Sequence, residues 1–482
     1  MGQMNVDTLR PCGRLETYST ARHHLGFYNN VGLTATYTSS STQQPSLESL
    51  IFAALHHVVA NHPNLSAIPI NEDKSHPGVH FASLPEIDLR TCVEFRRRGT
   101  ALPQGDETDG ELDGLLRELH DRNFKEGVKS RPYWRLIIAS YPRTPCAFTA
   151  SWIFHHALSD GASSMLFHQS FLEGLNAVPA PKDIDPVVRT PTTRLPPSLE
   201  ELHPMTISWS FFLRAVAGSL LPSYFAPRSP DLWTGYPVDA IVQTHVPSHN
   251  TTIALSAETT KTFAEKCRKE GTSVTAALST LLAAAIFPHI WPDTELRIDT
   301  PMSLRPVLDV SDTQMINAIT NHTFTHHRTT ESRSSNVIEM FSWATARRVK
   351  HDLVEQVKKK GADSPIALLK YVSNMHEYLV DKLGKPRDSS AEVSNLGVWR
   401  TPDPTDPDVR TPTWKLGRMT FSQSLNRTGP PLSLSAVTGG DACLVLSFNW
   451  EGEGGESALR RVPGLVKAGL EALVADKKEE ST

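Results

Sequence analysis

The sequence predicts a mixed α/β protein built from two large parts, and three observations support this prediction. Strand-like apolar runs alternate with helical stretches along the chain. A proline-rich segment interrupts this pattern after residue 177, and the pattern begins again beyond it. The length of 482 residues is also too great for one ordinary core. We therefore expect parts at residues 1–177 and 206–482, joined by a crossover linker at residues 178–205.

The first part is expected to contain both kinds of element. Its strand-like runs cover residues 31–37, 134–141 and 146–154. Its helical stretches cover residues 46–61, 111–121 and 161–175. The run at 146–154 is apolar almost throughout and has the length of a buried strand.

The linker is defined by its prolines, which favour extended backbone and interrupt helices. They are Pro179, Pro181, Pro186, Pro191, Pro196, Pro197 and Pro204.

The second part repeats the mixture. Expected strands cover residues 251–255, 392–399, 416–422, 432–437 and 444–450. Expected helices cover residues 257–270, 273–286, 337–359 and 456–474. The helix at 273–286 is apolar nearly all round, which predicts that it is buried.

Residues 206–225 form an apolar segment that could be mistaken for a membrane span. Arg214 and Pro222 interrupt it, and its uninterrupted core is shorter than the length of about 20 residues that a span needs. A packed amphipathic helix is the expected structure, with peripheral contact with a lipid surface as the alternative.

Composition excludes several classes of function. The hydrophobic content of 39% and charged content of 21% are typical of a globular protein, and a net charge of −4 gives no electrostatic footprint for nucleic acid. The five cysteines are scattered, so we expect reduced thiols. No signal peptide is visible at the N-terminus, which favours a cytoplasmic location.

The most informative segment is residues 153–161, Ile-Phe-His-His-Ala-Leu-Ser-Asp-Gly. It places His155, His156 and Asp160 on the turn between a buried strand and a helix. A neutral imidazole can accept a proton from a hydroxyl or an amine, and a nearby carboxylate can hold the loop or the ring in place. The segment is therefore predicted to be an active-site loop.

His156 to Asp160 match the HxxxD motif of acyltransferases with the chloramphenicol acetyltransferase-like fold. The longer form from His155 to Gly161 is most similar to fungal alcohol acetyltransferases and nonribosomal peptide condensation domains. The resemblance covers nearly the whole chain, through residues 14–18, 21–31, 132–136, 393–397 and 421–424. No Asp-Phe-Gly-Trp-Gly segment occurs, which argues against the plant BAHD branch of the superfamily.

This resemblance implies two chloramphenicol acetyltransferase-like domains with mixed sheets and an active-site tunnel at their interface. The substrates would be acyl-CoA, most simply acetyl-CoA, and an alcohol or amine; no bound cofactor is expected, and the protein is expected to be a monomer. His156 would be the general base, with His155 supporting it. Asp160 and Arg305 would form a buried ion pair that serves structure more than an Asp-His relay.

Direct transfer between the two substrates is expected, because the sequence offers no good nucleophile. A Gly-x-Ser-x-Gly motif is absent, and neither Cys146 nor Ser159 is well placed. The tetrahedral oxyanion would need donors, for which the backbone N–H of Gly161 and the hydroxyl of Ser422 or Ser424 are candidates. Asn395 is a candidate for the substrate lining.

A metal site is not expected. The histidine pairs at residues 23–24, 56–57 and 326–327 are adjacent in sequence, and adjacent side chains rarely converge on one ion. Two rival functions stay open: an amide-forming or carrier-protein-dependent condensing enzyme, and an inactive binding or scaffold protein with the same fold.

Overall fold

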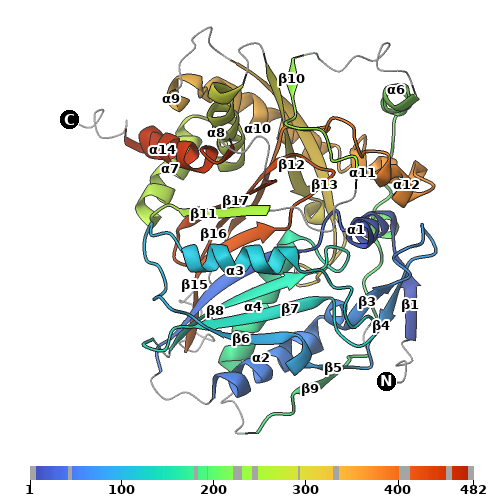
Figure 1. The fold of residues 1–482 in the computed structure, drawn as a ribbon, viewed down its shortest axis with the longest axis vertical. Coiled ribbons are helices and arrows are strands. Elements are labelled where there is room, and N and C mark those ends of the chain that lie inside the picture. The colour runs from blue at the N-terminus through green and yellow to red at the C-terminus, as the bar shows by residue number, and fades with distance from the viewer. Residues whose placement is uncertain are drawn as a thin grey trace.

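A computed structural model describes residues 7–41, 46–144, 146–177, 183–192, 194–220, 231–241, 248–290, 294–328, 336–400, 413–451 and 459–475. Within these ranges two large β-sheets each pack against helices (Figure 1). The predicted mixed α/β fold class is confirmed. Residues 1–6, and residues 178–182 of the expected linker, lie outside the described ranges.

The first sheet has five strands in the order β15-β2-β8-β7-β6. Their bounds are β15 Trp414–Gln423, β2 Val31–Ser39, β8 Ala147–Phe154, β7 Trp134–Ser140 and β6 Val93–Arg97. All neighbours are antiparallel except β6 and β7. β8 lies at the centre and is buried from Phe148 onward, as its continuous apolar sequence predicts.

Helices α2 (Leu47–Asn61) and α4 (Gly161–Ala177) pack against each other and share the core of this sheet, with α2 at the bottom of the sheet in Figure 1. Trp152 of β8 stacks on Phe167 of α4, with ring centroids 4.3 Å apart. This contact joins the strand before the histidine motif to the helix after it. On the upper side in Figure 1, α3 (Gly110–Asp121) lies between the two sheets.

The second sheet has seven strands, in the order β10-β12-β14-β16-β17-β11 with β13 also paired to β12. Their bounds are β10 Leu232–Trp233, β12 Glu295–Ser303, β14 Ala391–Val398, β16 Leu432–Thr438, β17 Leu444–Glu451, β11 Ser248–Ala254 and β13 Ile319–His327. The sheet is mixed. The pairs β10–β12, β12–β14 and β14–β16 are parallel. The pairs β16–β17, β17–β11 and β12–β13 are antiparallel.

The second sheet shares its core with α7 (Ala257–Lys269), α8 (Val274–Ile286) and α14 (Val462–Ala475). Every residue of α8 from Ala276 to Ile286 is buried, as its uniformly apolar sequence predicts. The single helix expected at 337–359 is instead two, α9 (Val337–Met340) and α10 (Trp343–Lys358). Ser342 separates them because its hydroxyl accepts from the N–H of Thr345 and begins a new helix.

Two parts of the chain connect the sheets. β15 comes from the C-terminal part of the sequence but pairs along β2 in the first sheet. Helix α1 (Arg14–Leu25), near the N-terminus, shares a third core with α11 (Pro365–Leu368) and α12 (Met375–Val380). Each half of the sequence therefore contributes to the surroundings of the other.

The remaining elements are short. One three-stranded sheet has the order β1-β4-β3, from β1 Asp7–Pro11, β4 His80–Ser83 and β3 Ala67–Ile70. Within the expected linker, β9 (Val187–Arg189) pairs with β5 (Glu86–Asp88), and α5 covers Leu199–Leu202.

Helix α6 (Trp209–Leu220) occupies the apolar segment, but it is less packed than the sequence predicts. The ring centroids of Phe212 and Tyr371 lie 4.8 Å apart. In contrast, Trp209 is 78% exposed and Leu213 is 60% exposed. Across the described ranges, no single helix has the length and apolar content needed to cross a membrane, although the bent pair α7 and α8 meets both criteria jointly.

Candidate active site

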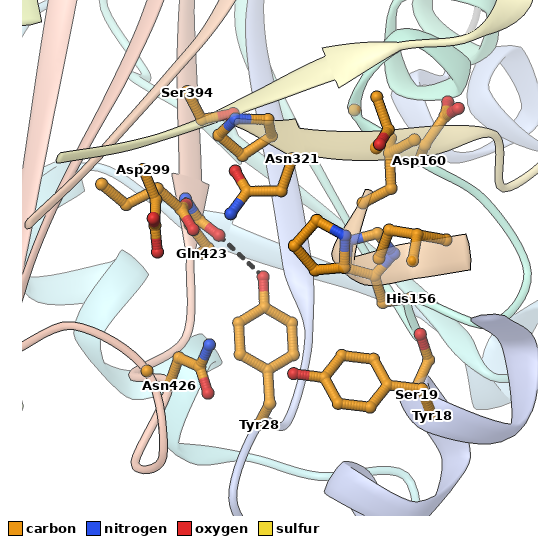
Figure 2. Close-up of a pocket in the computed structure, with 18 of the residues that line it drawn as sticks. Tyr18, Ser19, Tyr28, His156, Asp160, Asp299, Asn321, Ser394, Gln423 and Asn426 are labelled. Atoms are coloured by element: carbon orange, nitrogen blue, oxygen red, sulfur yellow. Dashed lines mark hydrogen bonds between the residues drawn. The ribbon is translucent and has the colours of Figure 1, made fainter. Parts of the chain in front are cut away.

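A cavity of about 400 Å³ lies between the two sheets. Residues of α1, β12, β13, β14 and β15 line it, together with the loop that follows β8. Four of the residues singled out from the sequence are in the lining: His156, Asp160, Gly161 and Asn395. Figure 2 shows His156 and Asp160 on one side of this cavity and Asp299 on the other.

His156 follows β8 at the turn into α4, as its place in the sequence predicts. The side-chain amide of Asn317 donates to its backbone carbonyl at 2.7 Å, which fixes the loop. Its ring lies against Tyr28, with centroids 5.9 Å apart. Burial, and then the positive charge of Arg22, lowers the pKa of His156 to about 4. The imidazole is therefore neutral at physiological pH and able to accept a proton.

Asp160 is fully committed to holding the loop. Its Oδ1 atom accepts from the backbone N–H of Ser163 at 2.8 Å, and its Oδ2 atom accepts from the N–H of Ala318 at 3.1 Å. Arg305 Nη2 lies 3.1 Å from Oδ1, so the predicted ion pair is present. Arg305 also donates to the carbonyl of Gln314 at 2.7 Å. These contacts join the motif loop to the chain that precedes β13.

No hydrogen bond joins Asp160 to the imidazole of His156 among the described residues, and the Nδ1 atom of His156 is buried there without a partner. The arrangement differs from an Asp-His relay, in which a carboxylate accepts from the ring. The geometry is that of a positioning residue.

Behind the motif, Glu72 contacts two buried histidines. Its Oε2 atom lies 2.8 Å from Nδ1 of His23, and its Oε1 atom lies 3.2 Å from Nε2 of His155. The N–H of Phe124 donates to the other ring nitrogen of His23, and the N–H of Ala157 donates to that of His155. In their neutral forms both rings therefore carry a proton on the nitrogen that faces Glu72.

These three side chains also have the composition and spacing of possible metal ligands, since their ligand atoms lie within 4.8 Å of one another. The sequence did not suggest this cluster, because His23 and His155 come from different histidine pairs. The N–H groups of Phe124 and Ala157 occupy the lone pair of each histidine ring. Each neutral ring therefore turns an N–H group, and not the lone pair that a metal ion would need, toward the carboxylate of Glu72. The contacts with the two histidines lower the pKa of Glu72 to about 2, against the opposing effect of its burial.

The far side of the cavity carries two acidic side chains. Asp299 of β12 and Glu392 of β14 are register partners on neighbouring strands. Burial raises the pKa of Glu392 to about 7 and also raises the pKa of Asp299. Gln423 donates to Glu392 at 2.9 Å and accepts from the hydroxyl of Tyr28 at 2.8 Å, the bond drawn in Figure 2. The cavity thus offers hydrogen-bond acceptors to a polar ligand.

The predicted oxyanion hydroxyls lie outside the cavity lining. Ser422 contacts Nε2 of His120 at 2.9 Å, and Ser424 accepts from the backbone N–H groups of Asn29 and Asn30. Their neighbours Phe421 and Gln423 line the cavity instead, because alternate residues of a strand face opposite sides.

Asn395 and Gly161 do line the cavity. Asn395 donates to Thr275 at 3.1 Å and accepts from the N–H of Gly397 at 2.9 Å, so both ends of its amide have partners. A Cβ atom at Gly161 would lie 2.6 Å from the side chain of Leu396, so glycine at this position lets Leu396 pack directly on the start of α4. Neither Cys146 nor Ser159 is in the lining.

Sequence reasoning missed Glu72, Asp299, Glu392 and Arg22 as site residues. Glu392 carries the one usable signal, a charged residue between apolar Ala391 and Val393 in a strand. Asp299 lies between Ile298 and Thr300 and has no such signal. Arg22 and Glu72 carry none, because only the folded chain brings them to the motif.

Comparison with known proteins assigns the family. The family model described as alcohol acetyltransferase matches residues 103–450. The chain belongs to the alcohol acetyltransferase family. It is 36% identical over 460 residues to a protein named Probable alcohol acetyltransferase crmB from Aspergillus fumigatus, covering 91% of this chain and 94% of that one. It is 26% identical to Probable alcohol acetyltransferase FCK4 from Fusarium pseudograminearum, over 93% of this chain and 91% of that protein.

Solved structures with the same fold include the trichothecene 15-O-acetyltransferase TRI3 from Fusarium sporotrichioides. The TM-score is 0.69 at 11% identity, over 96% of this chain and 94% of that chain. The first condensation domain of the calcium-dependent antibiotic synthetase matches with a TM-score of 0.57 at 12% identity, over 98% and 97% of the two chains. This alcohol acetyltransferase family member is thus an acyltransferase that acts on alcohols, in a fold shared with condensation domains.

Proposed function

We propose that the protein transfers an acetyl group from acetyl-CoA to the hydroxyl of a small-molecule alcohol, with His156 as the general base. The observation that carries this proposal is the place of His156: a buried, neutral imidazole in the wall of a cavity of about 400 Å³, within a chain of the alcohol acetyltransferase family. A fungal secondary metabolite is a fitting acceptor, because the relative TRI3 is a trichothecene acetyltransferase.

The reaction proceeds by direct attack. His156 takes the hydroxyl proton as the alcohol oxygen attacks the thioester carbon, and a tetrahedral intermediate forms. The intermediate collapses with cleavage of the carbon–sulfur bond, and the imidazolium returns the proton to the CoA thiolate. Alignment of the two substrates in one enclosed cavity supplies much of the rate, since it replaces a bimolecular encounter by a positioned one.

Three neighbours support His156 without touching the reacting atoms. Asp160 and Arg305 hold the loop against the chain near β13, and His155 accepts from the N–H of Ala157 with Glu72 close to its other nitrogen. Gly161, at the first position of α4, offers a backbone N–H to the oxyanion. We further propose that residues 1–177 and 206–482 form two domains with β15 exchanged into the first, and that the enzyme is a cytoplasmic monomer.

The test is a transfer assay with acetyl-CoA and a panel of alcohols and matched amines, followed by mass spectrometry of the products. We expect ester formation, intersecting initial-rate plots and no acylation of the enzyme by acetyl-CoA alone. Faster transfer from carrier-protein thioesters than from acetyl-CoA would instead support a condensing enzyme. A stoichiometric acyl adduct on Ser159 or Cys146 would contradict direct transfer.

A further inference from the structure

Arg22, in the last turn of α1, is a buried cation whose side chain has no hydrogen bond or ion pair within the part of the chain that the structure describes. It is 6% exposed and lines the same cavity as His156. Among the described residues its guanidinium makes no ion pair and no hydrogen bond, and its Nε atom is fully enclosed. Other arginines of this chain that are equally buried do have partners: Arg98 contacts Asp109 at 2.7 Å.

Two tyrosine rings hold the Arg22 guanidinium in place. Its Cζ atom lies 4.3 Å from the ring centroid of Tyr18 and 4.5 Å from that of Tyr28. Stacking on aromatic rings fixes the plane of the guanidinium, and its N–H donors lie in that plane. The rings therefore orient the group while leaving its donors free for hydrogen bonds.

A cation removed from water without a hydrogen-bonding partner is costly, and cation–π contacts offset only part of that cost. Such a group is expected where a ligand brings negative charge. The positive charge of Arg22 also contributes to the lowered pKa of His156, so the two groups act on the same region of the cavity.

The reaction creates one negative oxygen in that region. The hydroxyls of Ser422 and Ser424, predicted from the sequence to bind it, are engaged outside the cavity. We propose that Arg22 is a catalytic residue that donates N–H hydrogen bonds to the acyl carbonyl oxygen as that oxygen becomes negative. This inference rests on the proposed acetyl transfer and adds its electrophilic partner.

The proposed step moves one electron pair onto the carbonyl oxygen and back. As the alcohol oxygen forms its bond to the carbonyl carbon, the π pair of the carbonyl moves onto its oxygen, where Arg22 binds the charge. The pair returns when the carbon–sulfur bond breaks and the thiolate leaves. Arg22 keeps its protons throughout, since guanidinium groups in proteins stay charged.

The test compares Arg22→Met with Arg14→Met, at acetyl-CoA and alcohol concentrations spanning both KM values. Arg14 is also on α1, but it donates to the carbonyl of Val372 at 2.9 Å and does not line the cavity. Because the contact strengthens in the transition state, Arg22→Met is expected to lower kcat by about 10² to 10³, as removal of an oxyanion donor does. KM for both substrates should stay near wild type, and Arg14→Met should keep its kcat.

Two further readouts separate catalysis from structure. Removing the positive charge should move the ascending limb of the kcat/KM profile to higher pH, because a like charge near His156 is lost. Added guanidinium ion should restore part of the activity of Arg22→Ala and none of that of His156→Ala. If Arg22→Met does not fold, Arg22→Gln, which also lacks the charge, replaces it. The same loss of kcat, about 10² to 10³, is then expected.

A folded Arg22 variant with wild-type kcat overturns the inference, and so does a loss confined to the KM of the alcohol, which would mean that Arg22 binds an anionic group of the acceptor. These outcomes leave the proposed function intact if His156→Ala is inactive. An active His156→Ala variant would overturn the proposed function instead.

Discussion

Nε2 of His155, the residue next to the proposed base, lies 3.2 Å from Oε1 of Glu72, an ion-pair distance at which the two atoms do not have hydrogen-bond geometry. The N–H of Ala157 holds the opposite nitrogen of the His155 ring at 3.0 Å. The His155 ring thus has one hydrogen bond, from the backbone, and one charged neighbour beside the turn on which His156 sits. We expect Glu72 to act on the site through this neighbour, at a distance from the substrates.

Glu72→Gln should lower kcat without preventing folding. The amide keeps the size of the side chain but loses the charge to which both histidines point, so His155 loses its fixed orientation. Small displacements of a reacting group cost up to about 10² in rate. Steady-state kinetics of Glu72→Gln and of the adjacent exposed control Asp73→Asn measure the effect. Equal rates for the two variants would show that the contact does not matter for catalysis.

The same carboxylate should stabilise the fold in a defined pH range. The pKa of Glu72 is about 2 in the folded protein, against an ordinary value of 4.5. A folded pKa below the unfolded value gives stability that is present above pH 4.5 and lost as the pH falls toward 2. The difference in unfolding free energy between wild type and Glu72→Gln should shrink across that window. A difference that stays constant from pH 6 to 2.5, a range chosen to bracket these values, would refute this account.

His156→Ala should abolish transfer while leaving the fold intact. Loss of a general base costs about 10² to 10⁴ in rate. Product formation from acetyl-CoA, with circular dichroism to check the fold, gives the measurement. His327→Ala, at an exposed histidine, is the control. More than a tenth of wild-type turnover in His156→Ala would exclude this residue as the base.

Asp160→Ala and Arg305→Ala should each destabilise the protein by about 3 to 5 kcal/mol, because each strands the other charge in a mostly buried place. The double variant should lose less than the sum of the two, since neither charge is then left alone. Denaturant unfolding of the four proteins completes the cycle. Additive losses would mean that the two side chains act independently.

The pH profile of kcat/KM should have its ascending limb near pH 4. An ordinary imidazole titrates near 6.5, but burial lowers the pKa of His156 to about 4 in the free enzyme. The base is neutral and active above that value, and protonation removes activity below it. Initial rates between pH 3.5 and 8 at low substrate concentration, a range that brackets both values, provide the test. Glu392 lines the same cavity with a pKa of about 7, so the Glu392→Gln variant is measured beside wild type. A limb near 6.5 that persists in that variant would contradict the lowered pKa of His156.

Local elements of the fold were predictable because each carries its own pattern. The strands at residues 31–37 and 146–154 correspond to Val31–Ser39 and Ala147–Phe154, and the helix at 273–286 corresponds to Val274–Ile286. Helix α1 (Arg14–Leu25) was missed, because its buried positions include Glu16, Arg22 and His23 and it has almost no apolar face. Its surroundings, rather than its own periodicity, stabilise it.

The residues of the site also fall into two groups, those that a local sequence motif reveals and those that only the fold brings together. His156 and Asp160 share one loop, so a local motif could reveal them, and the distant partner Arg305 followed from a resemblance. Arg22, Glu72 and the carboxylates of Asp299 and Glu392 come from separate elements and meet only after folding. No spacing in the sequence encodes such a meeting.

The pairing of β15 with β2 has a consequence for synthesis on the ribosome. Residues 414–423 emerge long after residues 31–39, yet they complete the sheet to which those earlier residues belong. Until they arrive, one edge of β2 has free backbone donors and acceptors and can pair with other chains. The nascent enzyme therefore gains its cavity only after residue 423 has been made, and a chain truncated before residue 414 keeps an open β-edge.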